Sequence, residues 1–80
     1  MQGINDFANL AVGRPYEQYR RLQQSPGSYA SRIGWQEKSY ELPNGNRMYV
    51  DPMKPQCTVY WEVNKVGTIV GYKAEGIQCD

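Results

Sequence analysis

The sequence has 80 residues, the length of one small domain, because a chain this short buries too little surface to build a second core. Its 9 basic and 8 acidic residues give a net charge of +1, which does not indicate a nucleic acid partner. The absence of histidine excludes His-based nucleophile pairs and His-ligated zinc, and no apolar run approaches the roughly 18 residues of a membrane-spanning helix. Leu, Ile, Val and Phe number only 14, but seven Tyr and two Trp add apolar area, so we expect a folded domain with an aromatic core.

Two short helices are predicted within residues 1–24. In the first 12 residues, apolar side chains recur at the three- and four-residue steps of one helical face: Ile4, Phe7 and Leu10, with Ala8 and Ala11. Gly13 interrupts this pattern, and Pro15 opens a second helix in whose first turn the missing N–H costs nothing. The apolar stripe of this second helix comprises Tyr16, Tyr19 and Leu22. A Ser-Pro-Gly-Ser run then ends the helix, and we expect a loop over residues 25–34.

From residue 35 the hydrophobic period changes to two, which is typical of strands. Residues 35–42 form the first predicted strand, Asn44 and Gly45 give a strong hairpin signal, and residues 47–50 form the returning strand. Residues 51–55 contain two prolines. Because proline cannot donate to a ladder of hydrogen bonds, we expect this segment to be an exposed connection rather than a central strand.

The clearest hairpin follows, with strands at residues 58–63 and 68–73 around a turn at 64–67. A four-residue turn places Val63 opposite Thr68, whereas a bulge with a left-handed Gly67 shifts the register by one residue, and the sequence leaves both open. The predicted fold is α+β: two short N-terminal helices packed on a three- to four-stranded antiparallel meander sheet. We expect one domain over residues 1–80, with the sheet at 35–74 and a tail at 75–80.

Cys57 and Cys79 are the only cysteines. A disulfide between them would close a loop of about 23 residues and stabilise the domain by roughly 3 kcal/mol; the alternative is two free buried thiols. Two cysteines without histidine do not complete a tetrahedral metal site, and no CxxC motif indicates thiol exchange. We therefore predict a disulfide, which favours an exported protein in an oxidising compartment.

Candidate partner-binding residues lie on or beside the predicted strands: Tyr49, Met53, Tyr60, Trp61 and Tyr72. The simpler interpretation is that the aromatic residues, with Tyr40, form the core and its cross-strand pairs. However, helices cover only one face of such a sheet, and strand alternation places Tyr60 and Trp61 on opposite faces. We expect at least one of them to face solvent. Met53 lies at the centre of the proline-flanked segment, an adaptable apolar contact on a pre-organised loop.

No catalytic constellation emerges from the sequence. The carboxylates are spread over different elements; Glu37 and Glu41 would lie about 13 Å apart on one strand, too far for a glycosidase pair. Neither phosphate-binding glycine motif, GxxxxGK[ST] or GxGxxG, occurs. We therefore expect a protein that is not an enzyme, with no cofactor, no metal site, no nucleic acid partner and no small-molecule substrate.

Three segments resemble the SmpA/OmlA, or BamE-like, small outer-membrane lipoproteins. They are Gly-Arg-Pro-Tyr at residues 13–16, Leu-Pro-Asn-Gly-Asn-Arg-Met-Tyr at 42–49, and the hairpin Val-Tyr-Trp-Glu-Val-Asn-Lys-Val-Gly-Thr-Ile-Val at 59–70. The resemblance covers residues 10–74 and implies a helix-helix-strand-strand-strand layout related to the domain of β-lactamase inhibitor proteins. It further implies a periplasmic location and an outer-membrane anchor through a lipidated Cys N-terminal to this chain. Only some members carry a Cys pair around the last hairpin.

The resemblance implies a supporting role in envelope or β-barrel assembly through contacts with other envelope proteins. The alternative function is a secreted inhibitor or immunity-type module that blocks an enzyme with its sheet face or proline-flanked loop. Arg14, Arg20 and Arg21 give the helices a basic bias, which is typical of a solvated helix face. In a lipid-anchored domain these arginines would also lie within a Debye length of anionic lipid headgroups, so we include them as candidate lipid contacts.

Overall fold

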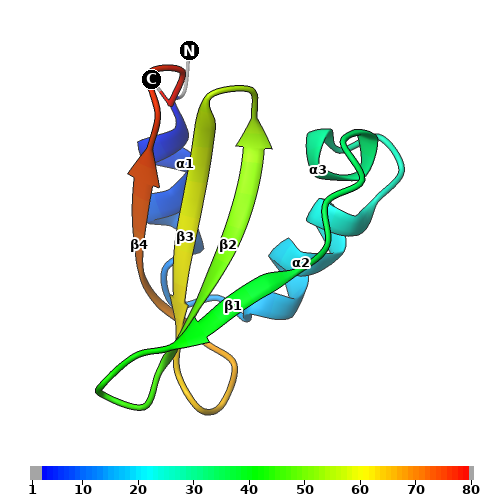
Figure 1. The fold of residues 1–80 in the computed structure, drawn as a ribbon. Helices are drawn as coiled ribbons and strands as arrows, with labels where there is room; N and C mark the ends of the chain where they lie inside the picture. The colour runs from blue at the N-terminus through cyan, green and yellow to red at the C-terminus, as the bar shows by residue number, and fades with distance from the viewer. Residues whose placement is uncertain (1–2, 80) are drawn as a thin grey trace.

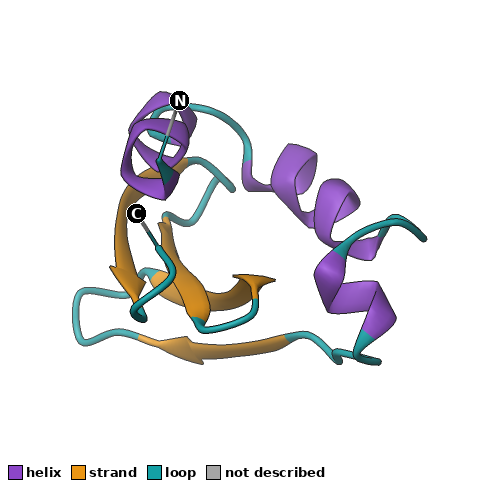
Figure 2. Ribbon diagram, turned by 90° about the horizontal axis from the view of Figure 1, so that it is seen from above, coloured by secondary structure: helices purple, strands orange, loops and turns teal. Residues whose placement is uncertain are grey.

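The computed structural model describes residues 3–79. They form a strongly curved four-stranded sheet with three helices on one side (Figures 1 and 2). The sheet is an antiparallel meander with strand order β1-β2-β3-β4, so the predicted α+β fold is confirmed. The elements are α1 (Ile4–Ala11), α2 (Tyr16–Gln24), α3 (Tyr29–Arg32), β1 (Lys38–Glu41), β2 (Arg47–Lys54), β3 (Cys57–Val63) and β4 (Ile69–Glu75). None of the described helices is long and apolar enough to cross a membrane.

The first two helices lie where the sequence predicts them, and the expected faces are buried except for the leucine of each stripe. In α1 the smallest side chains, Ala8 and Ala11, are fully buried, while Leu10 is 59% exposed. In α2, Tyr16 and Tyr19 are buried as expected, and Leu22 is 54% exposed. Ile4 and Phe7 of α1 are partly buried against the same core, so only the leucines depart from the expected faces.

The predicted loop at residues 25–34 contains a third helix, α3. The hydroxyl of Ser28 caps it by accepting a hydrogen bond from the Ser31 backbone N–H at 3.0 Å. Both serine hydroxyls also donate to the carbonyl of Gln23, which ties α3 to the end of α2. With four residues, α3 is too short to show a helical period, and the prediction of a loop was wrong for this reason.

The strands of the first hairpin differ from the predicted ones at both ends. β1 is shorter than predicted, whereas β2 continues through the proline-containing segment as far as Lys54. The expectation that residues 51–55 form an exposed connection was wrong, because Asp51 and Pro52 are buried and pair with β3. Pro52 is tolerated because β1 pairs with β2 only as far as Val50, so β2 has a single neighbouring strand beyond that point.

The second hairpin adopts the shifted register. Val63 pairs with Ile69, a bulge follows Glu62, and Gly67 has a left-handed φ of 89°. The side chain of Asn64 organises the turn by accepting from the backbone N–H groups of Val66 and Thr68. The bulged alternative is therefore the observed one.

The predicted disulfide is confirmed: Cys57 and Cys79 are bonded, with their Cα atoms 4.9 Å apart. The tail reaches this position through Gly76, whose φ is 130° and where a Cβ atom would collide with the backbone of Gln56. The N-terminal end is held at the same place, since the Ile4 backbone N–H donates to the Cys79 carbonyl at 3.1 Å. The disulfide thus lies beside both ends of the described chain.

Candidate functional site

Strand β3 separates the candidate residues into two groups by its alternation. Its odd-numbered side chains, from Cys57 to Val63, are buried under the helices, and its even-numbered ones are half-buried on the opposite face. Trp61 lies at the centre of the buried series with no exposed surface. Tyr60 faces the other way. The expectation that one member of this pair faces solvent therefore agrees with the alternation along β3.

Three of the proposed partner-binding residues belong to the core. Trp61 contacts Phe7, Tyr19 and Tyr72 through their rings. Tyr49 stacks on Tyr16 with ring centroids 4.2 Å apart. The Tyr72 hydroxyl donates to the side chain of Asn5 at 3.2 Å, which holds it against α1. Trp61 has no exposed surface with which to contact a partner, whereas Tyr49 and Tyr72 are half-buried and pack against the core.

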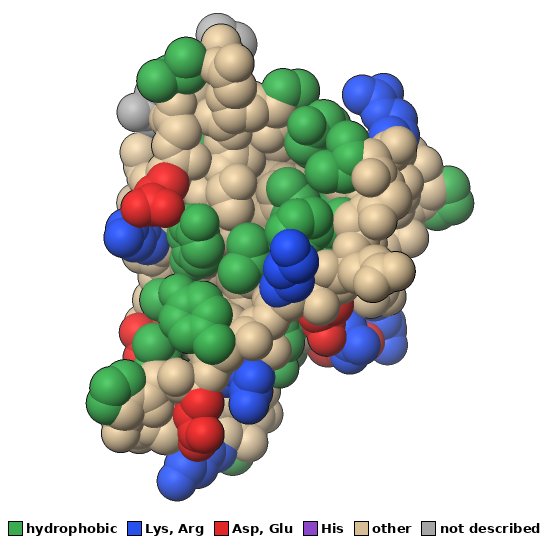
Figure 3. Space-filling view, in the orientation of Figure 1, with side chains coloured by type: hydrophobic (Ala, Val, Ile, Leu, Met, Phe, Trp, Pro, Cys, Tyr) green, Lys and Arg blue, Asp and Glu red, His purple; other side chains and the backbone are tan. Residues whose placement is uncertain are grey.

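The helix-free face of the sheet carries an apolar patch, which we call the open-face patch: Tyr40, Met48, Val50 and Tyr60. The strand register brings these residues together, because Tyr40 pairs with Met48 and Val50 pairs with Tyr60. Tyr40 is 49% exposed. Figure 3 looks onto this face and shows hydrophobic side chains gathered over the strands, with charges of both signs around them. Met48 and Val50 escaped the sequence analysis, although they alternate with Tyr49 and so had to share a face.

Charged side chains at the edge of the open-face patch neutralise one another. Lys73 and Glu75 form an ion pair at 3.0 Å on β4, which raises the pKa of Lys73 and lowers that of Glu75. Partial burial, and then the nearby Glu75 carboxylate, raise the pKa of the Tyr60 hydroxyl. At neutral pH the Tyr60 hydroxyl is therefore uncharged and hydrogen-bonds to the Glu75 carboxylate, and the face has no strong field of one sign.

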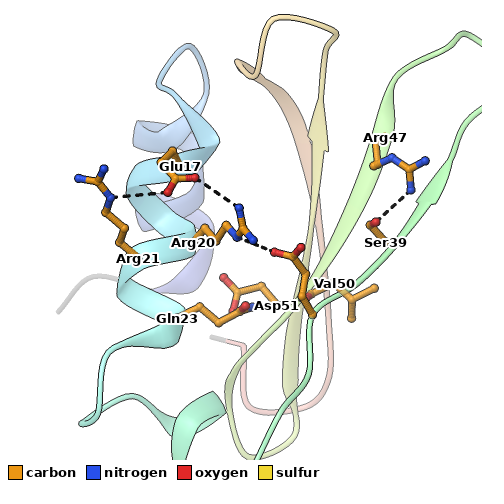
Figure 4. Close-up of polar contacts among 9 residues, drawn as sticks. Glu17, Arg20, Arg21, Gln23, Ser39, Arg47, Val50 and Asp51 are labelled. Atoms are coloured by element: carbon orange, nitrogen blue, oxygen red, sulfur yellow. Dashed lines mark hydrogen bonds and ion pairs between the residues drawn. The ribbon is translucent and has the colours of Figure 1, made fainter.

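A buried carboxylate lies on the helix side of the sheet. Asp51 is only 4% exposed; its Oδ1 accepts from Gln23 Nε2 at 2.9 Å and its Oδ2 from Trp61 Nε1 at 2.9 Å. Burial raises the pKa of Asp51, and the hydrogen bonds from Trp61 and Gln23 partly oppose this shift. Figure 4 shows Gln23 of α2 reaching toward Asp51 on β2.

The Tyr16 hydroxyl belongs to the same buried region. It has no hydrogen-bond partner within residues 3–79, and its pKa is raised by burial and then by the negative charge of Asp51. Tyr16 therefore stays neutral.

A pocket of about 130 Å³ opens beside Asp51, between α2, α3 and β2. Its walls are mostly apolar, and Asp51 with Gln23 supplies its polar end. The lining residues are Phe7, Tyr19, Leu22, Gln23, Ser28, Tyr29, Asp51, Pro52 and Met53. Met53 is thus a wall of this pocket rather than the tip of a loop. Asp51 and Gln23 were not identified from the sequence. For Asp51 a signal was present, because alternation along the strand places position 51 on the same face as Tyr49.

The arginines proposed for lipid headgroups have partners within the protein. Arg20 Nε lies 2.9 Å from Glu37 Oε1. The Glu17 carboxylate forms ion pairs with both Arg20 and Arg21 at 3.6 Å (Figure 4). The Arg14 guanidinium donates to the Leu10 carbonyl at 3.0 Å. These contacts offset part of the basic bias, and a lipid headgroup would have to compete with them.

Within residues 3–79, no three His, Cys, Asp or Glu side chains come together as a possible metal site. No family model, no curated protein and no solved structure matches this chain.

Proposed function

We propose that this chain is a non-enzymatic binding domain that acts by protein–protein contact through the open-face patch. The observation that supports it is the one-sided covering of the sheet. The helices cover one face (Figure 1), while the opposite face carries the exposed Tyr40 and the half-buried Met48, Val50 and Tyr60 in register. Tyrosine is enriched at protein interfaces because it combines apolar area with a hydroxyl that can donate.

We further propose a periplasmic domain of an outer-membrane lipoprotein that supports envelope or β-barrel assembly. The resemblance to the SmpA/OmlA, or BamE-like, lipoproteins supports this proposal, as does the order of N-terminal helices before an antiparallel meander. The disulfide also supports it, because such bonds persist in the periplasm and not in the reducing cytosol. The arginines of α2 remain secondary candidates for anionic lipid headgroups.

Site-specific photocrosslinking tests the open-face patch. A photoreactive phenylalanine at position 60, in cells that express the full-length gene product, is expected to form a discrete adduct with an envelope protein identified by mass spectrometry. The control places the same residue at Leu10, which lies on α1 and is more exposed than Tyr60, so accessibility alone would favour adducts at the control position. Equal adducts from both positions would overturn the role of the patch. An adduct with a soluble enzyme would favour the inhibitor-type alternative instead.

The lipoprotein assignment has its own test. Cells grown with radiolabelled palmitate are expected to label the full-length protein and to retain it in the outer-membrane fraction. A mature protein without label, released with the soluble periplasmic contents, would contradict the anchor and leave the binding role to be judged by the crosslinks.

A further inference from the structure

The pocket beside Asp51 combines apolar walls with one buried negative group. Phe7, Leu22 and Met53 form part of the apolar lining, and Gln23, Ser28 and Asp51 are polar members of the same lining. The volume is about 130 Å³. Since a cavity of about 150 Å³ accommodates the six heavy atoms of benzene, this space suits an occupant of about five heavy atoms.

The carboxylate of Asp51 retains unused hydrogen-bonding capacity. An ionised carboxylate offers about four acceptor positions, and only Gln23 and Trp61 donate to it among the described residues. Within the same residues 3–79, no Lys or Arg forms an ion pair with Asp51. A buried carboxylate without a cation is costly, and the raised pKa of Asp51 expresses this cost. An arriving cation would relieve it.

We propose that this pocket binds a lysine side chain of a partner protein, with the alkyl stem against the apolar wall and the ammonium group on Asp51. A lysine side chain has four carbons and one nitrogen, which matches the volume. Its ammonium group has three donors, two of which can use the free acceptor positions of the carboxylate. The pocket lies on the helix side of the sheet, so this inference is independent of the open-face patch.

Titration of the ¹⁵N-labelled wild-type protein with Nα-acetyl-lysine methylamide tests the proposal. The reporting signals are the Trp61 indole N–H and the Gln23 side-chain amide, because both groups donate to Asp51. We expect saturable shifts of these signals at millimolar ligand. The matched probe is Nα-acetyl-norleucine methylamide, which has the same stem without the ammonium group, at the same ionic strength. Its affinity is expected to be at least tenfold lower.

The result that overturns the proposal is equal affinity for the lysine and norleucine probes, since the pocket would then be only an apolar cleft. A tighter complex with Nα-acetyl-arginine methylamide would equally contradict a lysine site. Both outcomes are read from the wild-type protein, so they do not depend on whether a variant folds.

Two variants sharpen the assignment. Asp51→Asn keeps the shape of the side chain and removes its charge, and is expected to lower the affinity for the lysine probe about tenfold, to that of norleucine. Glu41→Gln removes an exposed carboxylate from β1 and is expected to leave the affinity unchanged. If both variants weaken binding equally, the cation is attracted by the general field of the protein, and the pocket proposal is wrong.

Discussion

The two faces of β3 are built from the same seven residues but serve different purposes. The odd-numbered side chains are buried on the helix side, whereas Thr58, Tyr60 and Glu62 on the other face are only half-buried, and Glu62 accepts hydrogen bonds from Asn44 and Asn46 of the neighbouring turn. Because successive side chains of a strand point in opposite directions, one segment carries both the core and the candidate interface. Aromatic character alone therefore does not distinguish a core position from an interface position, since Tyr60 and Trp61 are adjacent in the sequence.

The buried face is also the one that contains a charge. Asp51 lies among the core residues and fixes the Trp61 indole through a hydrogen bond, whereas the exposed face pairs its charges at the edge. A domain this small gains little from such a buried carboxylate unless it orders the core or serves a ligand. Substitutions on the two faces of β3, at the disulfide and at Asp51 test this difference between the faces.

The largest difference is expected between alanine substitutions at neighbouring positions of β3. Trp61→Ala removes a fully buried side chain and leaves a cavity, at a cost of about 3–5 kcal/mol in the free energy of unfolding. Tyr60→Ala removes only cross-strand contacts, at a cost of about 0.5–1 kcal/mol. Urea denaturation measures both values. Similar losses for the two variants would refute the distinction between the faces, and Trp61→Phe provides a milder variant if alanine abolishes folding.

The second prediction concerns the disulfide between Cys57 at the start of β3 and Cys79 in the C-terminal tail. Replacing both Cys57 and Cys79 by serine is expected to lower the free energy of unfolding by about 3 kcal/mol, because the unfolded chain regains the entropy of the 22-residue separation. Reduced wild-type protein is the control and should lose a similar amount. A loss below about 1 kcal/mol in urea denaturation would show that packing alone holds the tail.

The smallest effect concerns pH. Because burial raises the native pKa of Asp51 above its ordinary 3.8, the native state binds more protons there than the unfolded state between these two pKa values. The contribution of Asp51 to stability is therefore fully present below pH 3.8 and is lost as the pH rises through its native pKa. Relative to the wild type, Asp51→Asn should gain stability as the pH increases across this window.

Urea denaturation at a series of pH values from 3 to 8 measures this dependence and includes the window below pH 4.5 in which the control responds. Glu62→Gln is the control with the opposite sign, because hydrogen bonds from Asn46 and Asn44 lower the native pKa of Glu62. Its stability relative to the wild type should fall as the pH rises. A relative stability of Asp51→Asn that does not change with pH would contradict a raised pKa.

Hydrophobic periodicity was sufficient to predict the fold class, because each main element has a clear period and clear turn residues. The errors have local causes. Pro52 indicated a connection. The sequence does not show that the pairing of β2 with β1 stops at Val50, so that Pro52 has no neighbouring strand on the β1 side. α3 depends on Ser28 and on contacts with Gln23, which a four-residue segment does not reveal.

The pocket was harder to predict than the fold. Gln23, Asp51 and Trp61 come from three elements and meet only after α2 has packed on the sheet. Alternation along β2 and β3 places Asp51 and Trp61 on one face, but only the packing of α2 adds Gln23. The open-face patch was partly predictable, since Tyr60 was identified from alternation while Met48 and Val50 were overlooked.

The hydrogen bond between Ile4 and Cys79 joins the two ends of the described chain at one pole of the molecule (Figure 1). The turns at 42–46 and 64–67 lie at the other pole. Neighbouring ends permit circular permutation. A short linker could join these two ends, and the chain could be opened in the turn at 64–67. Both termini would then lie at the opposite pole, and every strand pairing would be kept. The domain is thus a candidate for insertion into a surface loop of another protein.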